Sequence, residues 1–118
     1  GTVWVIDVAA RKALKVIPIP TDSKPMGVVM SPNGRRVYVS NGRGGTVSVI
    51  DPATDSVIAS VPVGQRPWGI ALTPDGGRLY TANGPSNDVS VVDTKDLAVT
   101  RKIPVGKLPW GVAIGQAP

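Results

Sequence analysis

The sequence predicts an all-β protein made of short antiparallel strands, and three observations support this fold class. Valine dominates the apolar residues, while 14 glycines and 12 prolines interrupt the apolar stretches, a composition typical of short strands joined by tight turns. No stretch of helical length has apolar residues spaced at i, i+3, i+4 and i+7. The sequence also repeats itself with a period of about 42 residues.

Four sequence landmarks recur in one order at this period. The most regular is Pro-x-Gly, which occurs at residues 25–27, 67–69 and 109–111. The others are an apolar segment ending in Asp, a Ser/Thr-Pro-Asn/Asp-Gly turn and a segment with Tyr second and Asn last; their copies lie at 2–7, 46–51 and 88–93, at 31–34 and 73–76, and at 37–41 and 79–83. Such agreement is not expected by chance, so the chain is a tandem repeat.

Each repeat divides into four short strands separated by turn residues. In the complete middle repeat the first strand is expected over residues 27–31, ending in a Pro-Asn-Gly turn whose Asn and Gly tolerate positive φ. The second strand is expected over 36–41, before a Gly-rich hairpin loop, the third over 46–51 and the fourth over 57–63. Four antiparallel strands at a period of about 40 to 45 residues are typical of a β-propeller blade.

The chain therefore corresponds to about two and a half blades. We expect residues 1–24 to form the last two strands of a blade, 25–66 and 67–108 to form full blades, and 109–118 to form an inner strand and a tail. Propellers close with typically four to eight blades, and joining the two ends of this chain would leave a strand missing from the shared blade. We therefore expect further blades from the rest of a longer chain.

The segment Tyr38-Val39-Ser40-Asn41 lies between Ser-Pro-Asn-Gly and Val-Ser-Val-Ile-Asp. In this setting it resembles the YVTN-type β-propeller repeat, and the resemblance covers essentially the whole chain. The motif is not kept in full, because Ser40 and Ala82 occupy its third position and the second copy reads Tyr80-Thr81.

The YVTN-type family occurs in bacterial and archaeal surface-layer proteins and in secreted or periplasmic propellers, some linked to quinoprotein metabolism. Similar repeats occur in the haem d1 domain of nitrite reductase and in the propeller of nitrous oxide reductase. The resemblance implies a periplasmic or extracellular location, on the cell surface in the case of a surface-layer protein. It predicts the fold more closely than the activity, because propellers support many functions.

The composition excludes several kinds of catalytic and binding site. Thirteen Lys and Arg against eight Asp give a net charge of +5, but no basic run exceeds two residues, which favours ordinary surface charge and gives no specific nucleic-acid signal. There is no apolar run long enough to predict a transmembrane segment. The chain has no Cys and no His, which removes disulfides, thiol catalysis and most transition-metal and haem ligation from this stretch. We predict no cofactor and no metal site.

No catalytic residue is predicted either. Asp7, Asp51 and Asp93 are repeat equivalents at strand ends, where an Asx-type hydrogen bond to the following backbone is the expected role. Ser48 and Ser90 lie in the middle of strands without a base to activate them.

One group of residues remains as a candidate binding site. In a propeller, the loop that leads from an outer strand to the next inner strand opens on the same face as the loop between the second and third strands. Recurring residues in these loops offer cations, large apolar side chains and amides around the channel mouth, which suits an anionic or planar ligand. The predicted rim residues are Lys24, Arg66, Trp68, Lys107, Trp110, Asn41 and Asn83. The alternative is that the two tryptophans simply wedge between blades.

Three function classes remain open at this point. The one we favour is a non-enzymatic binding or scaffold module with a protein partner or an anionic small molecule at the channel mouth. The second is the propeller portion of a periplasmic redox enzyme whose cofactor ligands lie outside this segment. The third is a surface-layer structural protein.

Overall fold

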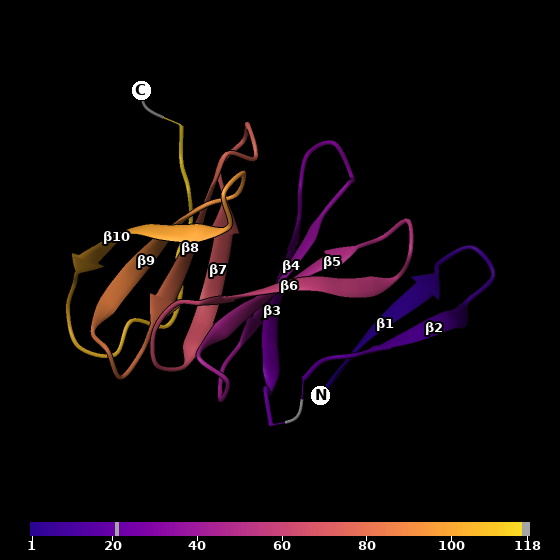
Figure 1. The fold of residues 1–118 in the computed structure, drawn as a ribbon, viewed down its shortest axis with the longest axis horizontal. Coiled ribbons are helices and arrows are strands. Elements are labelled where there is room, and N and C mark those ends of the chain that lie inside the picture. Colours follow the sequence, from indigo (N-terminus) through magenta and orange to yellow (C-terminus); the bar gives the residue numbers. More distant parts are fainter. Residues whose placement is uncertain (21, 117–118) are drawn as a thin grey trace.

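The computed structural model describes residues 1–20 and 22–116, which contain ten β-strands and no helix. The strands form one two-stranded and two four-stranded sheets, and every pair of neighbouring strands is antiparallel (Figure 1). The all-β fold class is therefore confirmed. Within these residues no helix exists that could cross a membrane.

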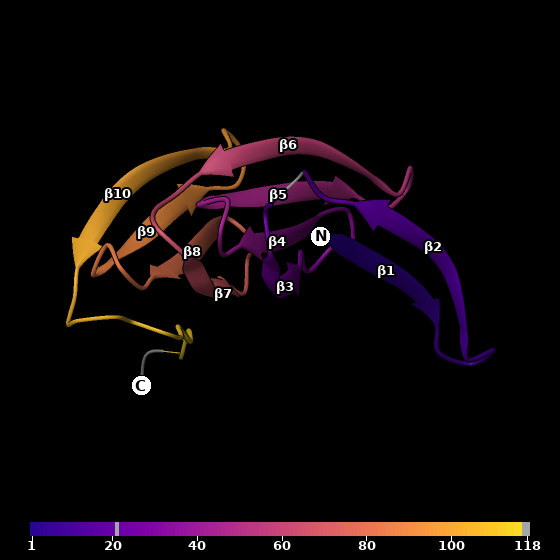
Figure 2. The same ribbon diagram turned by 90° about the horizontal axis from the view of Figure 1, so that it is seen from below.

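The three sheets follow one another along the chain. In order, they consist of β1 (Thr2–Asp7) and β2 (Lys12–Pro18); β3 (Pro25–Met30), β4 (Val37–Asn41), β5 (Thr46–Asp51) and β6 (Ser56–Pro62); and β7 (Pro67–Leu72), β8 (Arg78–Asn83), β9 (Asp88–Asp93) and β10 (Ala98–Pro104). Consecutive strands are neighbours throughout, so each four-stranded sheet is a meander, as in a propeller blade. Figure 2 shows β2, β6 and β10 along an outer arc, with β3 and β7 on the inside.

The first strand of the β3–β6 sheet begins at Pro25, two residues earlier than the sequence predicts, and β7 begins at the equivalent Pro67. Pro25 pairs with Asn41 and Gly27 with Ser40, which leaves Met26 as the extra residue of a β-bulge. The same register shift lies between Pro67 and Gly69. Hydrophobic patterning does not reveal such a bulge, because a bulge changes the register between strands and not the composition of either strand.

The inner strand predicted within 109–118 is not paired into a sheet over its described residues, 109–116. An inner strand is held by hydrogen bonds to a second strand, and no second strand follows among the described residues. The segment nevertheless packs against β7, because a Cβ on Gly69 would lie 2.7 Å from the Cα of Gly111. Likewise a Cβ on Gly27 would lie 2.8 Å from Cγ2 of Ile70. The assignment of 1–24, 25–66, 67–108 and 109–118 to blades of one propeller stays a prediction.

Both faces of the β3–β6 sheet are covered by other parts of the chain. A cluster of buried side chains joins it to the β7–β10 sheet, and a second cluster joins it to β1 and β2. The first cluster consists of Tyr38, Val47, Val49, Val61, Val63, Leu79 and Val92, and the second of Ile17, Ile19, Val39 and Ile50. Strands buried on both faces need apolar, mostly β-branched side chains at successive positions, which explains the abundance of valine.

We predict that the contact between the two four-stranded sheets dominates stability. Leu79 is fully buried in the first cluster, so Leu79→Ala should lower the free energy of unfolding by about 2–5 kcal/mol through lost burial and a residual cavity. Urea denaturation followed by tryptophan fluorescence measures this loss. Ile58→Ala on the outer strand β6, where the side chain is 47% exposed, is the control and should cost clearly less. Equal losses would contradict the prediction.

The same contact predicts a pH dependence. Burial raises the pKa of the Tyr38 hydroxyl above the usual 10.0, outweighing the opposing effects of a hydrogen bond with Thr94 and the charge of Arg36. Unfolded chains ionise this phenol at lower pH than folded ones, so its contribution to stability is complete below about pH 10 and is lost as the pH rises through the folded pKa. The free energy of unfolding should therefore fall more steeply above about pH 10 in the natural protein than in Tyr38→Phe. Parallel pH profiles for the two proteins would refute this.

Candidate functional site

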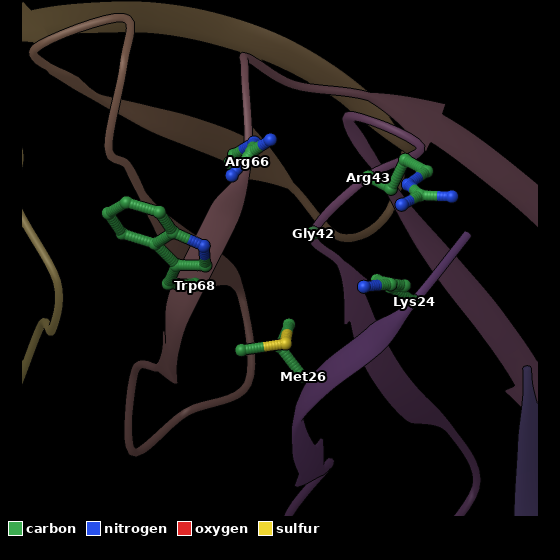
Figure 3. A pocket seen from close by; sticks show the side chains of 6 residues that line it. All are labelled: Lys24, Met26, Gly42, Arg43, Arg66 and Trp68. Carbon is green, nitrogen blue, oxygen red and sulfur yellow. The ribbon is translucent and has the colours of Figure 1, made fainter. Parts of the chain in front are cut away.

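A small hollow of about 80 Å³ lies where the loops of the two four-stranded sheets meet. Its lining residues are Lys24, Met26, Gly42, Arg43, Arg66 and Trp68. Figure 3 shows the three cationic and two large apolar side chains around one opening, with the ammonium group of Lys24 directed into it. Three of the predicted rim residues, namely Lys24, Arg66 and Trp68, are therefore brought together.

The bulges described above place the apolar side chains of the hollow. Met26 and Trp68 are the bulged residues of β3 and β7, and a bulge re-aims the side chain that it carries. Each side chain lies over a glycine that follows a buried asparagine. A Cβ on Gly42 would lie 2.9 Å from Cγ of Met26, and a Cβ on Gly84 would overlap the ring of Trp68. Glycine is required at both positions because a larger residue would displace the wall of the hollow.

The cations are held by a loop conformation that recurs in each repeat. Lys24 and Arg66 both have φ of +48°, in the left-handed region that non-glycine residues rarely adopt. Their carbonyl oxygens accept hydrogen bonds from the backbone N–H groups of Gly42 at 2.8 Å and Gly84 at 3.3 Å. The third equivalent position is Leu108, with φ of +51°. The two cations thus leave the backbone in the same geometry, whereas the third repeat offers an apolar side chain there.

Arg43 completes the cationic wall and was not among the predicted rim residues. Its guanidinium lies 3.7 Å from the carboxylate of Asp22, and both side chains are largely exposed, so this ion pair contributes little to stability. The backbone N–H of Arg43 donates to the carbonyl of Ser23 at 3.0 Å, which ties its loop to the loop that carries Lys24. Arg43 could have been predicted from the sequence, because it lies in the loop between the second and third strands, which opens on the same face as the other rim loops.

Lys107 and Trp110 do not line the hollow. Lys107 is exposed one position before Leu108. The ring of Trp110 packs against that of Trp68, with centroids 4.8 Å apart and planes tilted by 40°, while 70% of Trp110 stays exposed. Trp68 therefore packs against the following segment and also forms a wall of the hollow, while its role in ligand binding stays a prediction.

Asn41 and Asn83 are fully buried and do not reach the rim surface. The Asn41 amide donates to the hydroxyl oxygens of Thr46 at 3.0 Å and Ser48 at 2.8 Å. The Asn83 amide donates to the carboxylate of Asp88 and to the hydroxyl of Ser90, at 2.8 and 2.9 Å. These side chains hold the second and third strands together below the rim, and their donors are occupied there.

The two asparagines differ in one acceptor. Oδ1 of Asn83 accepts a hydrogen bond from the hydroxyl of Thr81 at 3.0 Å, whereas Oδ1 of Asn41 is buried without a partner. Val39 occupies the position equivalent to Thr81 and has no hydroxyl to donate. The hydrogen bond between Thr81 and Asn83 in one repeat therefore has no counterpart at Asn41 in the preceding repeat.

We predict that this difference is measurable. Thr81→Val should lower the free energy of unfolding by about 1–3 kcal/mol, because it leaves a second buried carbonyl oxygen unpaired. Val39→Thr supplies the missing donor with nearly the same volume and should be neutral or stabilising by up to about 1 kcal/mol. Denaturant titration of both variants tests the pair, and equal destabilisation by the two substitutions would show that the hydroxyl has no specific role.

Four of the aspartates accept hydrogen bonds within turns. Asp7, Asp51 and Asp93 accept hydrogen bonds from backbone N–H groups two or three residues ahead, as predicted. Asp75 accepts from the Thr73 hydroxyl and the Gly77 N–H, which lower the pKa of its carboxyl in that order of importance. Among the described residues no three His, Cys, Asp or Glu side chains come together in a way that could hold a metal ion.

Comparison with known proteins places this geometry in a family. A family model described as a YNCE-like beta-propeller matches residues 1–118. The chain belongs to this family. YVTN-type propellers are a related family, so the resemblance noted in the sequence is confirmed at the level of the β-propeller and not for the YVTN family itself.

Solved structures similar to this chain include two enzymes. Hydrazine synthase from Kuenenia stuttgartiensis is 36% identical with a TM-score of 0.74, over 80% of this chain and 27% of that one. Dihydro-heme d1 dehydrogenase NirN in complex with DHE is 25% identical with a TM-score of 0.75, over 91% and 24% of the two chains. A functionally unknown protein from Desulfotomaculum acetoxidans is 24% identical with a TM-score of 0.82, over 97% and 38% of the chains, and supports the fold alone.

A curated relative is similar over a smaller part of the chain. The uncharacterized protein YwhL of Bacillus subtilis is 36% identical over 61 residues, which are 52% of this chain and 13% of that protein. The chain thus spans less than two-fifths of each protein to which it is compared.

Proposed function

We propose that this chain is a non-enzymatic binding or scaffold module whose loop-side rim takes an anionic ligand or an acidic partner. The observation that carries the proposal is the hollow, where Lys24, Arg43 and Arg66 from three separate loops converge. Like charges held together repel one another unless an anion offsets them, and Asp22 pairs with only one of the three.

The walls of the hollow suit the same class of ligand. Guanidinium groups bind carboxylate or phosphate oxygens through two parallel hydrogen bonds. Trp68 offers an aromatic face and Met26 an adaptable apolar contact beside these cations. The combination of fixed charge and flat apolar surface favours a planar anion or an acidic side chain presented by a protein.

The similarity to two solved enzyme structures supports a second candidate function. Hydrazine synthase and dihydro-heme d1 dehydrogenase are redox enzymes, and their chains match this one at 36% and 25% identity. The chain could serve as the propeller portion of such an enzyme, with all cofactor ligands supplied from outside this segment. A redox-active cofactor that co-purifies with the protein would favour this candidate over the first.

We further propose that additional strands of the same repeat cover the apolar face beside β1. Trp4 and Ile6 are 57% and 59% exposed, whereas the equivalent residues of β5, Ser48 and Ile50, are buried. The difference arises because the β1–β2 sheet packs over this face of β5 through the cluster that contains Ile50. Among the described residues, no sheet packs over the same face of β1. An apolar groove also lies between β1 and the β3–β6 sheet, lined by residues such as Val3, Val5 and Met30. Further strands beside β1 would bury both.

The proposed location is the periplasm or the cell exterior, on the basis of the resemblance to secreted and periplasmic propellers. Fractionation of the native host, with the protein detected by antibody, tests this. Recovery in the cytoplasmic fraction would contradict it.

The binding proposal is tested with mellitate, a benzene ring carrying six carboxylates, as the probe. Calorimetric titration at low ionic strength should show binding that weakens as salt is added, because the exposed cations are screened. Arg66→Glu reverses one charge in the hollow and should weaken binding by about tenfold or more.

The matched control is Arg101→Glu, which changes the net charge equally on β10, outside the hollow. It should keep the affinity of the natural protein to within a small factor. If the two variants bind mellitate equally well, or if the natural protein does not bind it at low salt, the rim is only a solvated surface.

A further inference from the structure

The chain contains three Asn-Gly pairs, at residues 33–34, 41–42 and 83–84, and the structure places them in two different environments. Asn33 and Gly34 are exposed in the turn between β3 and β4. Asn41 and Asn83, by contrast, are fully buried at the ends of β4 and β8. Asn-Gly is the dipeptide in which the following backbone nitrogen attacks the side-chain amide most readily, because glycine has no side chain to obstruct the approach.

The turn around Asn33 prepares its side-chain carbonyl for such an attack. Oδ1 of Asn33 accepts two hydrogen bonds, from the Ser31 hydroxyl at 2.7 Å and from the Arg35 N–H at 2.9 Å. Two donors on a carbonyl oxygen stabilise the negative charge that develops there when a nucleophile adds to the carbon. The positively charged Arg35 and Arg36 follow Gly34 in the sequence.

We propose that Asn33 is a site of spontaneous deamidation. The Gly34 nitrogen forms a bond to Cγ of Asn33, the bond from Cγ to the side-chain nitrogen breaks, and ammonia leaves with the proton from Gly34. Water then opens the resulting cyclic imide at either carbonyl, which yields aspartate or isoaspartate. The net change is the addition of one water and the loss of one ammonia, so the only co-reactant is solvent.

One bond must open before the attack. The Gly34 N–H donates to the carbonyl of Ser31 at 2.9 Å, so its nitrogen becomes a nucleophile only when the turn opens. Exposed turns open locally at a low free-energy cost, in contrast to buried strands. Gly34 has φ of +71° and nothing within 4 Å of its Cβ position, so no packing opposes this motion.

The other two pairs lack each of these conditions. Both amide nitrogens, which would have to leave, are held by hydrogen bonds inside the sheet, and water has no access to Asn41 or Asn83. The nitrogens of Gly42 and Gly84 donate to the loops that carry Lys24 and Arg66. Opening them would disrupt the rim as well as the strand ends.

The aspartate product fits the existing turn. The equivalent residue in the next repeat is Asp75, whose Oδ1 accepts from the Thr73 hydroxyl at 2.6 Å and from the Gly77 N–H at 2.9 Å. These contacts reproduce those of Asn33 with Ser31 and Arg35. Deamidation to aspartate would therefore add a negative charge beside Arg35 and Arg36 and leave the turn geometry unchanged.

The experiment is to hold the folded protein in mildly alkaline buffer and map deamidation over time by mass spectrometry. Trypsin separates the three pairs into the peptides 16–35, 37–43 and 79–95. Asn33 should deamidate at least about tenfold faster than Asn41 and Asn83, because only its turn opens without unfolding. Isoaspartate at Asn33, detected by labelling with an isoaspartyl methyltransferase, should accompany aspartate.

Two controls make the result decisive. In denaturant all three asparagines should deamidate at comparable rates, which attributes the difference to the fold. Asn33→Gln should remove the signal from peptide 16–35, and Asn33→Asp should unfold with the stability of the natural protein. Equal rates at the three sites in the folded protein, or the same ranking in denaturant, would overturn the proposal.

Discussion

Every sheet of this chain depends on a neighbouring sheet to cover it. A four-stranded meander has two faces, and in the β3–β6 sheet both are filled with side chains such as Val39, Val49 and Ile50 that water would solvate poorly. Each face is covered only because the next repeat presents the same kind of surface. Contacts between neighbouring sheets therefore stabilise the fold more than contacts within one sheet, as in other proteins built from stacked repeats. Where a neighbour is lacking, as beside β1, large apolar side chains such as Trp4 are left exposed.

The rim is a product of this stacking. Met26 and Trp68 leave their strands at bulges and lie on glycines that follow buried asparagines, so the buried amide network supports the hollow from below. Lys24 and Arg66 come from loops whose left-handed backbone is tied to the same glycines. The buried amide hydrogen bonds and the exposed loop hydrogen bonds thus connect the pairing of the strands to the positions of the side chains that line the hollow.

The sequence revealed the fold class because its landmarks recur at a fixed period and their turn residues have defined backbone preferences. The convergence of Lys24, Arg66 and Trp68 could be predicted for the same reason, since equivalent positions of a repeat face the same side. The burial of Asn41 and Asn83 was missed because asparagine is usually exposed. The signal was the polar pattern of the following strand, where Ser48 and Ser90 point inward as its partners. The bulges were missed because register depends on pairing between strands.

The left-handed loop position that carries Lys24 and Arg66 is occupied by Leu108 in the next repeat. Of the three equivalent loop positions, only the two beside the hollow therefore carry a cation. An anion drawn to them would settle over the seam between the β3–β6 and β7–β10 sheets, with Trp68 on one side. The repeat thus creates equivalent positions at which a ligand could be held. The replacement of a cation by Leu108 at one of them leaves only the other two suited to an anion.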